Sequence, residues 1–181
     1  MARHPGRSPA RLTDARIRYG IAESSLGPVL VGFSDQGLCA LLLLVGDTSE
    51  IGIERLREMH PLALIERDDM VARTIASRIG PYLSGEDDCV DVKLDLSAGT
   101  GFRRRVWEAV RLIPRGETRS YGEIAEQVGS PRAARAVGTA CGANPIALLI
   151  PCHRVVGSGT SLGGYGWGLD RKVALLELER A

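Results

Sequence analysis

The sequence predicts an α/β protein with two domains: a small first domain built on a three-stranded antiparallel sheet, and a mostly helical second domain containing a helix-turn-helix. Two observations predict this division. Short apolar runs separated by glycine-containing turns fill the first half of the chain, as in antiparallel hairpins. In the second half, apolar residues recur at helical spacing between glycines and prolines. With 181 residues, the chain can hold two small cores.

The first domain begins with a meander. Three runs predict its antiparallel strands: residues 17–22, 28–33 and 38–44. Residues 50–59 and 68–83 have the apolar spacing of two helices. Residues 90–96 then alternate apolar and charged side chains, which predicts a half-buried strand. We expect three parts: a disordered arm at residues 1–14, the first domain at 15–96 and the second at 97–181.

The second domain opens with a linker of small residues, 97–101. Residues 102–112 predict a helix with apolar residues on one side and arginines on the other. Ser120 and Glu123 fit a capping box, in which each side chain binds a free backbone amide at the start of a helix. A helix over residues 121–128 should therefore follow.

The next helix completes a helix-turn-helix. Gly129 ends the preceding helix, while Ser130 can cap and Pro131 can open a second helix over residues 131–142. A helical hairpin packed only for stability has the same pattern. The composition of the second helix therefore has to indicate its role.

Small residues make up almost all of this second helix, and Arg132 and Arg135 are its long polar side chains. A helix that reads bases in the major groove needs Asn, Gln, Arg or Lys at several positions. A surface of Ala and Gly instead allows close approach to DNA, and one arginine can enter the duplex. We therefore predict binding to double-stranded DNA through the minor groove, without sequence readout.

The charge distribution supports a polyanionic partner. The net charge is only +1, but residues 1–96 hold 11 basic and 15 acidic side chains, whereas residues 97–181 hold 12 and 7. Eight arginines lie close together in the second half: Arg103, Arg104, Arg105, Arg111, Arg115, Arg119, Arg132 and Arg135. Such a surface can face phosphates, although scattered solvated charges are the alternative.

A thiol and an imidazole stand side by side at Cys152 and His153, after the apolar run 146–150. We expect this run to be a strand that delivers a nucleophile to a site. The thiolate is the reactive form of cysteine, and a neighbouring base favours it. A buried cysteine that only fills the core is the alternative.

Several protein classes are disfavoured. The longest apolar run, residues 38–45, is far shorter than the roughly 20 residues of a membrane span, and residues 1–11 lack an apolar stretch for export. The four cysteines are widely spaced and only three histidines occur, so neither a disulfide framework nor a zinc cluster is predicted. Reduced thiols fit a cytoplasmic location, which we predict.

Three motifs resemble those of a known family: Pro151-Cys152-His153-Arg154-Val155, Arg135-Ala136-Val137-Gly138 and Asn144-Pro145. Together they are similar to the O6-alkylguanine-DNA alkyltransferases, also called methylated-DNA-protein-cysteine methyltransferases. Residues 164–168, Gly-Tyr-Gly-Trp-Gly, add a likeness to the C-terminal half of the Ada-type adaptive-response proteins. The resemblance covers nearly the whole chain after the N-terminal arm. It implies a ribonuclease H-like first domain and a winged-helix-like second domain.

The resemblance also implies a reaction. Cys152 would accept the alkyl group of O6-alkylguanine, and of O4-alkylthymine, in one irreversible transfer that needs neither cofactor nor metal. His153 would take the thiol proton through a water, and Glu179 would orient that imidazole. Asn144 would be the hinge that braces the active-site turn.

Recognition of DNA follows from the same resemblance. Tyr121, Val155 and Gly166 would bind the extruded base, and Arg135 would replace it in the stack. The residues implied to contact DNA are Arg135, Tyr121, Ser130, Arg132 and Gly138. Because a base inside a duplex cannot reach a protein thiol, the reaction requires flipping. A monomer with no membrane association is expected.

Three other functions remain open. A lesion-binding module would share this architecture without an acceptor thiol, and Cys152 weighs against it. A Cys-His hydrolase would turn over and would not depend on DNA. A helix-turn-helix regulator would be dimeric and would carry polar base-reading side chains on residues 131–141, which are absent from that helix.

Overall fold

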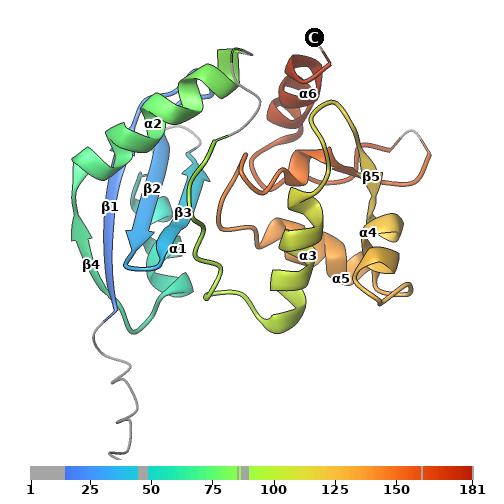
Figure 1. The fold of residues 1–181 in the computed structure, drawn as a ribbon, viewed down its shortest axis with the longest axis horizontal. Coiled ribbons are helices and arrows are strands. Elements are labelled where there is room, and N and C mark those ends of the chain that lie inside the picture. The colour runs from blue at the N-terminus through green and yellow to red at the C-terminus, as the bar shows by residue number, and fades with distance from the viewer. Residues whose placement is uncertain (1–14, 45–48, 85, 87–89, 160, 181) are drawn as a thin grey trace, which may run out of the picture.

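A computed structural model describes residues 15–44, 49–84, 86, 90–159 and 161–180 of the chain. The predicted disordered arm, residues 1–14, lies outside these ranges. The fold is α/β, with a sheet and two helices in the first half and mainly helices in the second (Figure 1).

The predicted meander is confirmed. Strands β1 (Arg16–Ala22), β2 (Val29–Ser34) and β3 (Gly37–Leu43) pair as consecutive antiparallel neighbours. The sheet is nevertheless four-stranded and mixed, because β4 (Leu64–Arg67) adds to β1 in parallel and gives the order β3-β2-β1-β4. The expectation of three antiparallel strands was therefore incomplete. The four residues of β4 are largely exposed at the sheet edge, so they lack the alternation of apolar and polar side chains from which a strand could be predicted.

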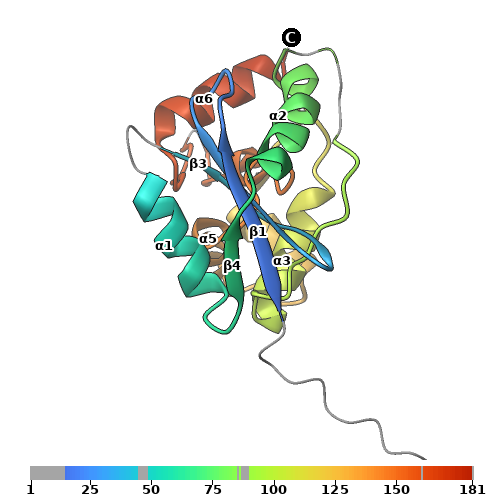
Figure 2. The same ribbon diagram turned by 90° about the vertical axis from the view of Figure 1, so that its left-hand side faces the viewer.

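Two helices accompany the sheet. Helix α1 covers Ser49–Met59, and α2 covers Asp69–Ser84 and packs against β1 and β2 (Figure 2). Gly20 permits this approach of α2, since a Cβ atom there would lie 2.8 Å from the Cα of Asp69. Both predicted helices are thus present, each shifted by one residue at its start.

The strand predicted at residues 90–96 is wrong. Only Leu94 forms a bridge, to Leu38 of β3, where Leu38 donates to the Lys93 carbonyl at 2.9 Å. Farther along the same strand, Leu41 bridges to Ile146 of the second half. The outer edge of β3 is thus shared between two segments, and each of them forms a single isolated bridge rather than a strand.

The second half begins with α3 (Gly101–Arg111), capped by the Thr100 side chain. Helix α4 (Tyr121–Gln127) has the predicted capping box, with Ser120 and Glu123 binding each other's backbone amides. Helix α6 (Leu169–Leu178) closes the fold. A short parallel pair, β5 (Arg119–Ser120) and β6 (Val155–Val156), was not predicted, because two-residue strands carry no periodic pattern.

The second helix of the helix-turn-helix starts later than predicted. Helix α5 covers Ala134–Gly142, and its first turn has no side-chain cap. Residues 130–133 form a turn instead, in which the Ala133 amide donates to the Ser130 carbonyl at 2.8 Å. Placing the helix start at Pro131 was therefore wrong. The backbone of Ser130, rather than its side chain, shapes this turn.

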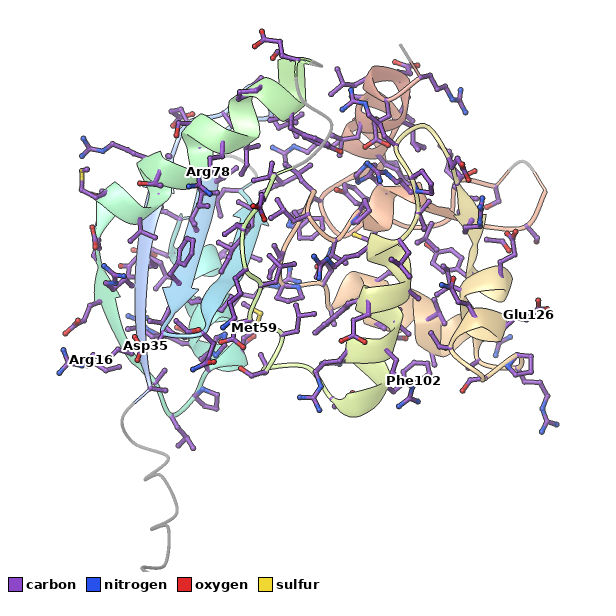
Figure 3. All side chains as sticks on the ribbon, viewed as in Figure 1. Arg16, Asp35, Met59, Arg78, Phe102 and Glu126 are labelled. Atoms are coloured by element: carbon purple, nitrogen blue, oxygen red, sulfur yellow. The ribbon has the colours of Figure 1, made fainter. Side chains whose placement is uncertain are left out.

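One hydrophobic core extends through both halves. The buried Trp107 of α3 belongs to it, and its indole donates to the Ala140 carbonyl of α5 at 2.8 Å. Figure 3 shows side chains filling the space between the sheet and α3, while Arg16 and Glu126 point outward at opposite ends of the molecule. No helix in the described ranges is both long enough and apolar enough to cross a membrane.

Candidate active site

The segment before Cys152 is a tight turn, so the prediction of a strand at residues 146–150 is wrong. After the single bridge at Ile146, the Ile150 amide donates to the Ile146 carbonyl at 3.0 Å. Leu148 has a φ of 67°, a left-handed conformation that costs a bulky side chain about 1–2 kcal/mol. The side chains of Ile146, Leu148 and Ile150 are buried, so the run is apolar because it lies in the core. Cys152 then starts a 3₁₀ turn, Cys152–Arg154.

Asn144 joins this turn to the end of α5. Its side-chain nitrogen donates to the Cys152 sulfur at 3.1 Å and to the Ile150 carbonyl at 2.8 Å. Its oxygen accepts from the Ile146 amide at 2.9 Å. The fully buried Asn144 side chain therefore fixes the position of the sulfur from two sides of the turn.

The Cys152 thiol is protonated at neutral pH. Burial raises its pKa to about 11, although the hydrogen bond from Asn144 and the charge of Lys172 act in the opposite direction. Only the thiolate is a strong nucleophile. A base must therefore remove the proton for the thiol to react.

His153 can supply that base. Its Nε2 lies 2.7 Å from Oε1 of Glu179, and both side chains are completely buried. Burial lowers the pKa of His153 despite the neighbouring carboxylate, so the imidazole is neutral. A hydrogen on Nε2 pointing at Glu179 leaves a lone pair on Nδ1, which has no partner among the described residues.

Glu179 has two further partners that the sequence did not reveal. Arg154 donates to both carboxylate oxygens, at 2.8 and 2.9 Å, and the Tyr82 hydroxyl donates to Oε1 at 2.5 Å. Burial alone would raise the pKa of Glu179, but its hydrogen bonds to His153, Arg154 and Tyr82 lower it well below its usual range. The carboxylate is thus held charged against the imidazole.

Lys172 of α6 was also missed. Its fully buried ammonium donates to the carbonyls of Val155 at 2.7 Å, Leu162 at 2.5 Å and Gly164 at 3.2 Å. The group therefore connects β6 to the loop that follows it. No local signal marks Lys172 in the sequence, because lysine is usually a surface residue and only the fold shows that this one is buried.

A cavity of about 840 Å³ opens onto Cys152. The predicted residues Tyr121, Arg135, Gly138 and Gly166 line it. The Tyr121 hydroxyl donates to the Gly164 carbonyl at 3.3 Å, which connects the start of α4 to the segment before α6. The cavity lies between α5, the start of α4 and two short stretches, residues 157–158 and 164–166, and it is large enough for a flat aromatic base.

The remaining predicted residues lie around this cavity rather than in its wall. Val155 is buried in β6, and its carbonyl accepts a hydrogen bond from Lys172. Ser130 and Arg132 precede α5, where Arg132 is exposed. Arg135, which does line the cavity, is also exposed. Within the described part of the chain, no group of three or more His, Cys, Asp or Glu side chains could hold a metal ion.

Comparisons with known proteins agree with this geometry. A family model described as the DNA-binding domain of 6-O-methylguanine DNA methyltransferase matches residues 101–181. A methylated-DNA–protein-cysteine methyltransferase of Methanosarcina acetivorans is 42% identical over 89% of this chain and 97% of its own length. The crystal structure of Mycobacterium tuberculosis OGT in complex with DNA has a TM-score of 0.75 at 44% identity, covering 91% of this chain and 92% of that one.

Other relatives match over only part of their length. The bifunctional transcriptional activator/DNA repair enzyme Ada of Escherichia coli is 42% identical over 90% of this chain but only 45% of its own length. The methyltransferase of Mycolicibacterium paratuberculosis is 61% identical over 57% of this chain and 62% of its own. The chain thus spans less than two thirds of either relative. The buried Cys-His-Glu arrangement and the match over nearly all of the archaeal relative together place this chain in the family of methylated-DNA–protein-cysteine methyltransferases.

Proposed function

We propose that this chain repairs DNA by transferring the alkyl group of O6-alkylguanine irreversibly to Cys152. One observation carries the proposal. The Cys152 sulfur borders a cavity of base size, is fixed by Asn144, and neighbours an imidazole oriented by a buried carboxylate. This is the arrangement required to activate a thiol whose pKa burial has raised.

The transfer balances without a cofactor. His153 receives the thiol proton through a water, and the sulfur attacks the alkyl carbon as the bond from that carbon to O6 breaks. The electron pair leaves with guanine, which regains a proton from solvent at N1. The resulting thioether cannot be hydrolysed by the same site, so each molecule acts once. The O4-alkyl group of thymine is a second proposed substrate of the same displacement.

The base has to leave the duplex to reach Cys152. We infer that α5 enters the minor groove and that Arg135, exposed at the rim of the cavity, occupies the space left in the stack. The small residues of α5, Gly138 among them, support this role because they allow close approach to DNA. Ser130 and Arg132, in the turn before α5, would then contact phosphates.

The finer architecture belongs to the same proposal. A ribonuclease H-like first domain, a winged-helix-like second domain and a boundary near residue 97 would suit a chain with a DNA-binding second half. The single-use acceptor supports a monomer, and the need for a reduced thiol supports a cytoplasmic location. The Cys152 thiol distinguishes this chain from a lesion-binding module, and the small residues of α5 disfavour a regulator that reads bases.

Intact-mass spectrometry tests the function. A duplex with one O6-methylguanine should add one methyl group to each protein molecule, located on Cys152. Cys152→Ala should accept none, whereas Cys141→Ala, which removes the second thiol lining the cavity, should still accept one. More than one demethylated base per protein molecule would contradict the proposal and indicate a hydrolase.

A further inference from the structure

Two buried polar atoms near Cys152 have no hydrogen-bond partner among the described residues. One is Nδ1 of His153 and the other is the hydroxyl oxygen of Tyr165. A buried polar group without a hydrogen bond destabilises the fold, so each of these atoms needs a partner. The proposed function uses Nδ1 but gives the hydroxyl no role.

The two atoms belong to rings that pack together. The His153 and Tyr165 rings meet edge to face, with centroids 6.4 Å apart and planes at 85°. The Trp167 ring also packs edge to face against Tyr165, with centroids 5.3 Å apart and planes at 67°. Tyr165 also lines the cavity onto which Cys152 opens. The Tyr165 ring therefore lies against the imidazole and, together with Cys152, lines the cavity.

We propose that the Tyr165 hydroxyl and Nδ1 of His153 together hold the water that carries the Cys152 proton, so that Tyr165 is a positioning residue for the relay. The proposal rests on the function inferred above. A water bound at two points has a fixed orientation, and one of its lone pairs stays available to the thiol hydrogen. The water accepts that proton and passes one of its own to Nδ1, which leaves a thiolate and an imidazolium stabilised by Glu179.

The burial of Tyr165 fits a neutral hydrogen-bonding role. Burial raises the pKa of Tyr165, and the Cys152 charge acts in the same direction. The phenol therefore stays protonated and takes no proton itself. Other groups whose charges reach the Cys152 sulfur are Lys172, Arg55, Cys141 and Tyr121. All of these remain when only the Tyr165 hydroxyl is removed.

Tyr165→Phe tests the proposal because it keeps the ring contacts with His153 and Trp167 and removes only the hydroxyl. Tyr19→Phe, a matched change on β1 outside the cavity, is the control. Cys152 is labelled with iodoacetamide in each protein and followed by peptide mass, while methyl transfer from duplex DNA is measured in parallel. At neutral pH we expect Tyr165→Phe to slow both reactions about tenfold, less than the 10²–10⁴ typical of losing the base itself.

Two further readouts separate a relay from packing. The deficit of Tyr165→Phe should shrink as the pH rises toward the Cys152 pKa of about 11, because the thiol then ionises without help. Adding Tyr165→Phe to His153→Gln should cause no further loss. Equal rates in Tyr165→Phe and wild type, a deficit that is constant with pH, or an additive double variant would each overturn the proposal. Labelling uses no DNA, so a wild type that is labelled through the relay but takes no methyl would contradict the proposed function alone.

Discussion

At the scale of single residues, Glu179 determines the orientation and the tautomer of the His153 imidazole. Its carboxylate accepts hydrogen bonds from His153, Arg154 and Tyr82, which come from the 3₁₀ turn and from α2. Arg154 also donates to the Ile113 carbonyl, so its side chain is fixed at both ends. The imidazole consequently has one orientation and one tautomer, with Nδ1 free to receive a proton.

Replacing Glu179 by Gln should slow methyl transfer by about 10² to 10⁴, since the imidazolium formed in the reaction loses its countercharge. Glu177→Gln is the matched control, because Glu177 is exposed in the last turn of α6, two residues before Glu179. Single-turnover quench-flow with duplex O6-methylguanine measures both, and thermal unfolding checks that each variant is folded. Equal rates for the two variants would remove Glu179 from the proton path.

Much of the site could be named from the sequence, and the reason differs between residues. Cys152, His153 and Asn144 lie within ten positions of one another, so a local motif contains them. Glu179 could be named only through a resemblance, because nothing local distinguishes it from Glu177. Tyr82 carries no local signal at all, since its partner lies 97 positions away. Arg154 was overlooked because arginine is usually a surface residue, and only the fold shows that it is buried.

At the scale of elements, the loop after β6 forms one wall of the cavity. Lys172 binds two of its carbonyls, and the Tyr121 hydroxyl binds one of these, that of Gly164. Gly163 has a φ of 67°, and a Cβ atom there would lie 2.7 Å from the Tyr121 ring. The loop can therefore approach α4 closely only if this position is glycine.

Gly163→Ala should lower the rate of methyl transfer, because either Tyr121 or the loop must move away from the cavity. Gly159→Ala is the control, since Gly159 has a φ of 66° but open space around its Cβ position. Both variants should lose about 1 kcal/mol of unfolding free energy from backbone strain, measured by urea denaturation. Only Gly163→Ala should also lose activity, and similar activity in the two variants would contradict a role for the Tyr121 contact.

Helix α5 gives a prediction that separates base flipping from chemistry. Arg135→Ala should slow repair of duplex DNA much more than repair of a single-stranded oligonucleotide carrying O6-methylguanine, because the single strand needs no replacement in a stack. Arg18→Ala, which removes an exposed charge from β1, controls for the loss of one arginine. Single-turnover rates on both substrates give the comparison. Equal slowing on the two would assign Arg135 a structural role.

Sequence patterns predicted most helices and strands, but the prediction was wrong where tertiary contacts determine the backbone conformation. The residues of α1, α2, α3 and α4 follow helical spacing and were placed to within two residues. Residues 146–150 read as a strand because they are uniformly apolar, yet the hydrogen bonds of Asn144 bend them into a turn. Apolar character reports burial, and it does not distinguish a buried turn from a buried strand.

At the scale of the whole molecule, acidic side chains prevail in the first half of the chain and basic ones in the second. The cavity and α5 lie in the second half, whereas α1, α2 and the sheet form the other side (Figure 1). A polyanion should therefore approach from one side only, and its affinity should depend strongly on salt.

We expect the logarithm of DNA affinity to fall linearly with the logarithm of salt concentration and to vary little among unrelated duplexes. Arg132→Ala should reduce this slope by about one unit, as expected for the loss of one phosphate contact. Arg73→Ala, an exposed arginine of α2, should leave the slope unchanged. Fluorescence anisotropy titrations measure both. A strong preference for one sequence would favour a regulator.

The hydrogen bond between Tyr82 and Glu179 also has a consequence for folding. It closes a loop of 97 positions, and contacts at such long sequence separation form late, after the entropy of loop closure has been overcome. A chain that has folded only locally can contain the Cys152 turn, but its imidazole has no fixed carboxylate. If the Cys152 turn is buried before this contact forms, burial has already raised the pKa of the thiol, and no oriented imidazole is present to remove its proton. Alkyl transfer should therefore begin only in the last step of folding.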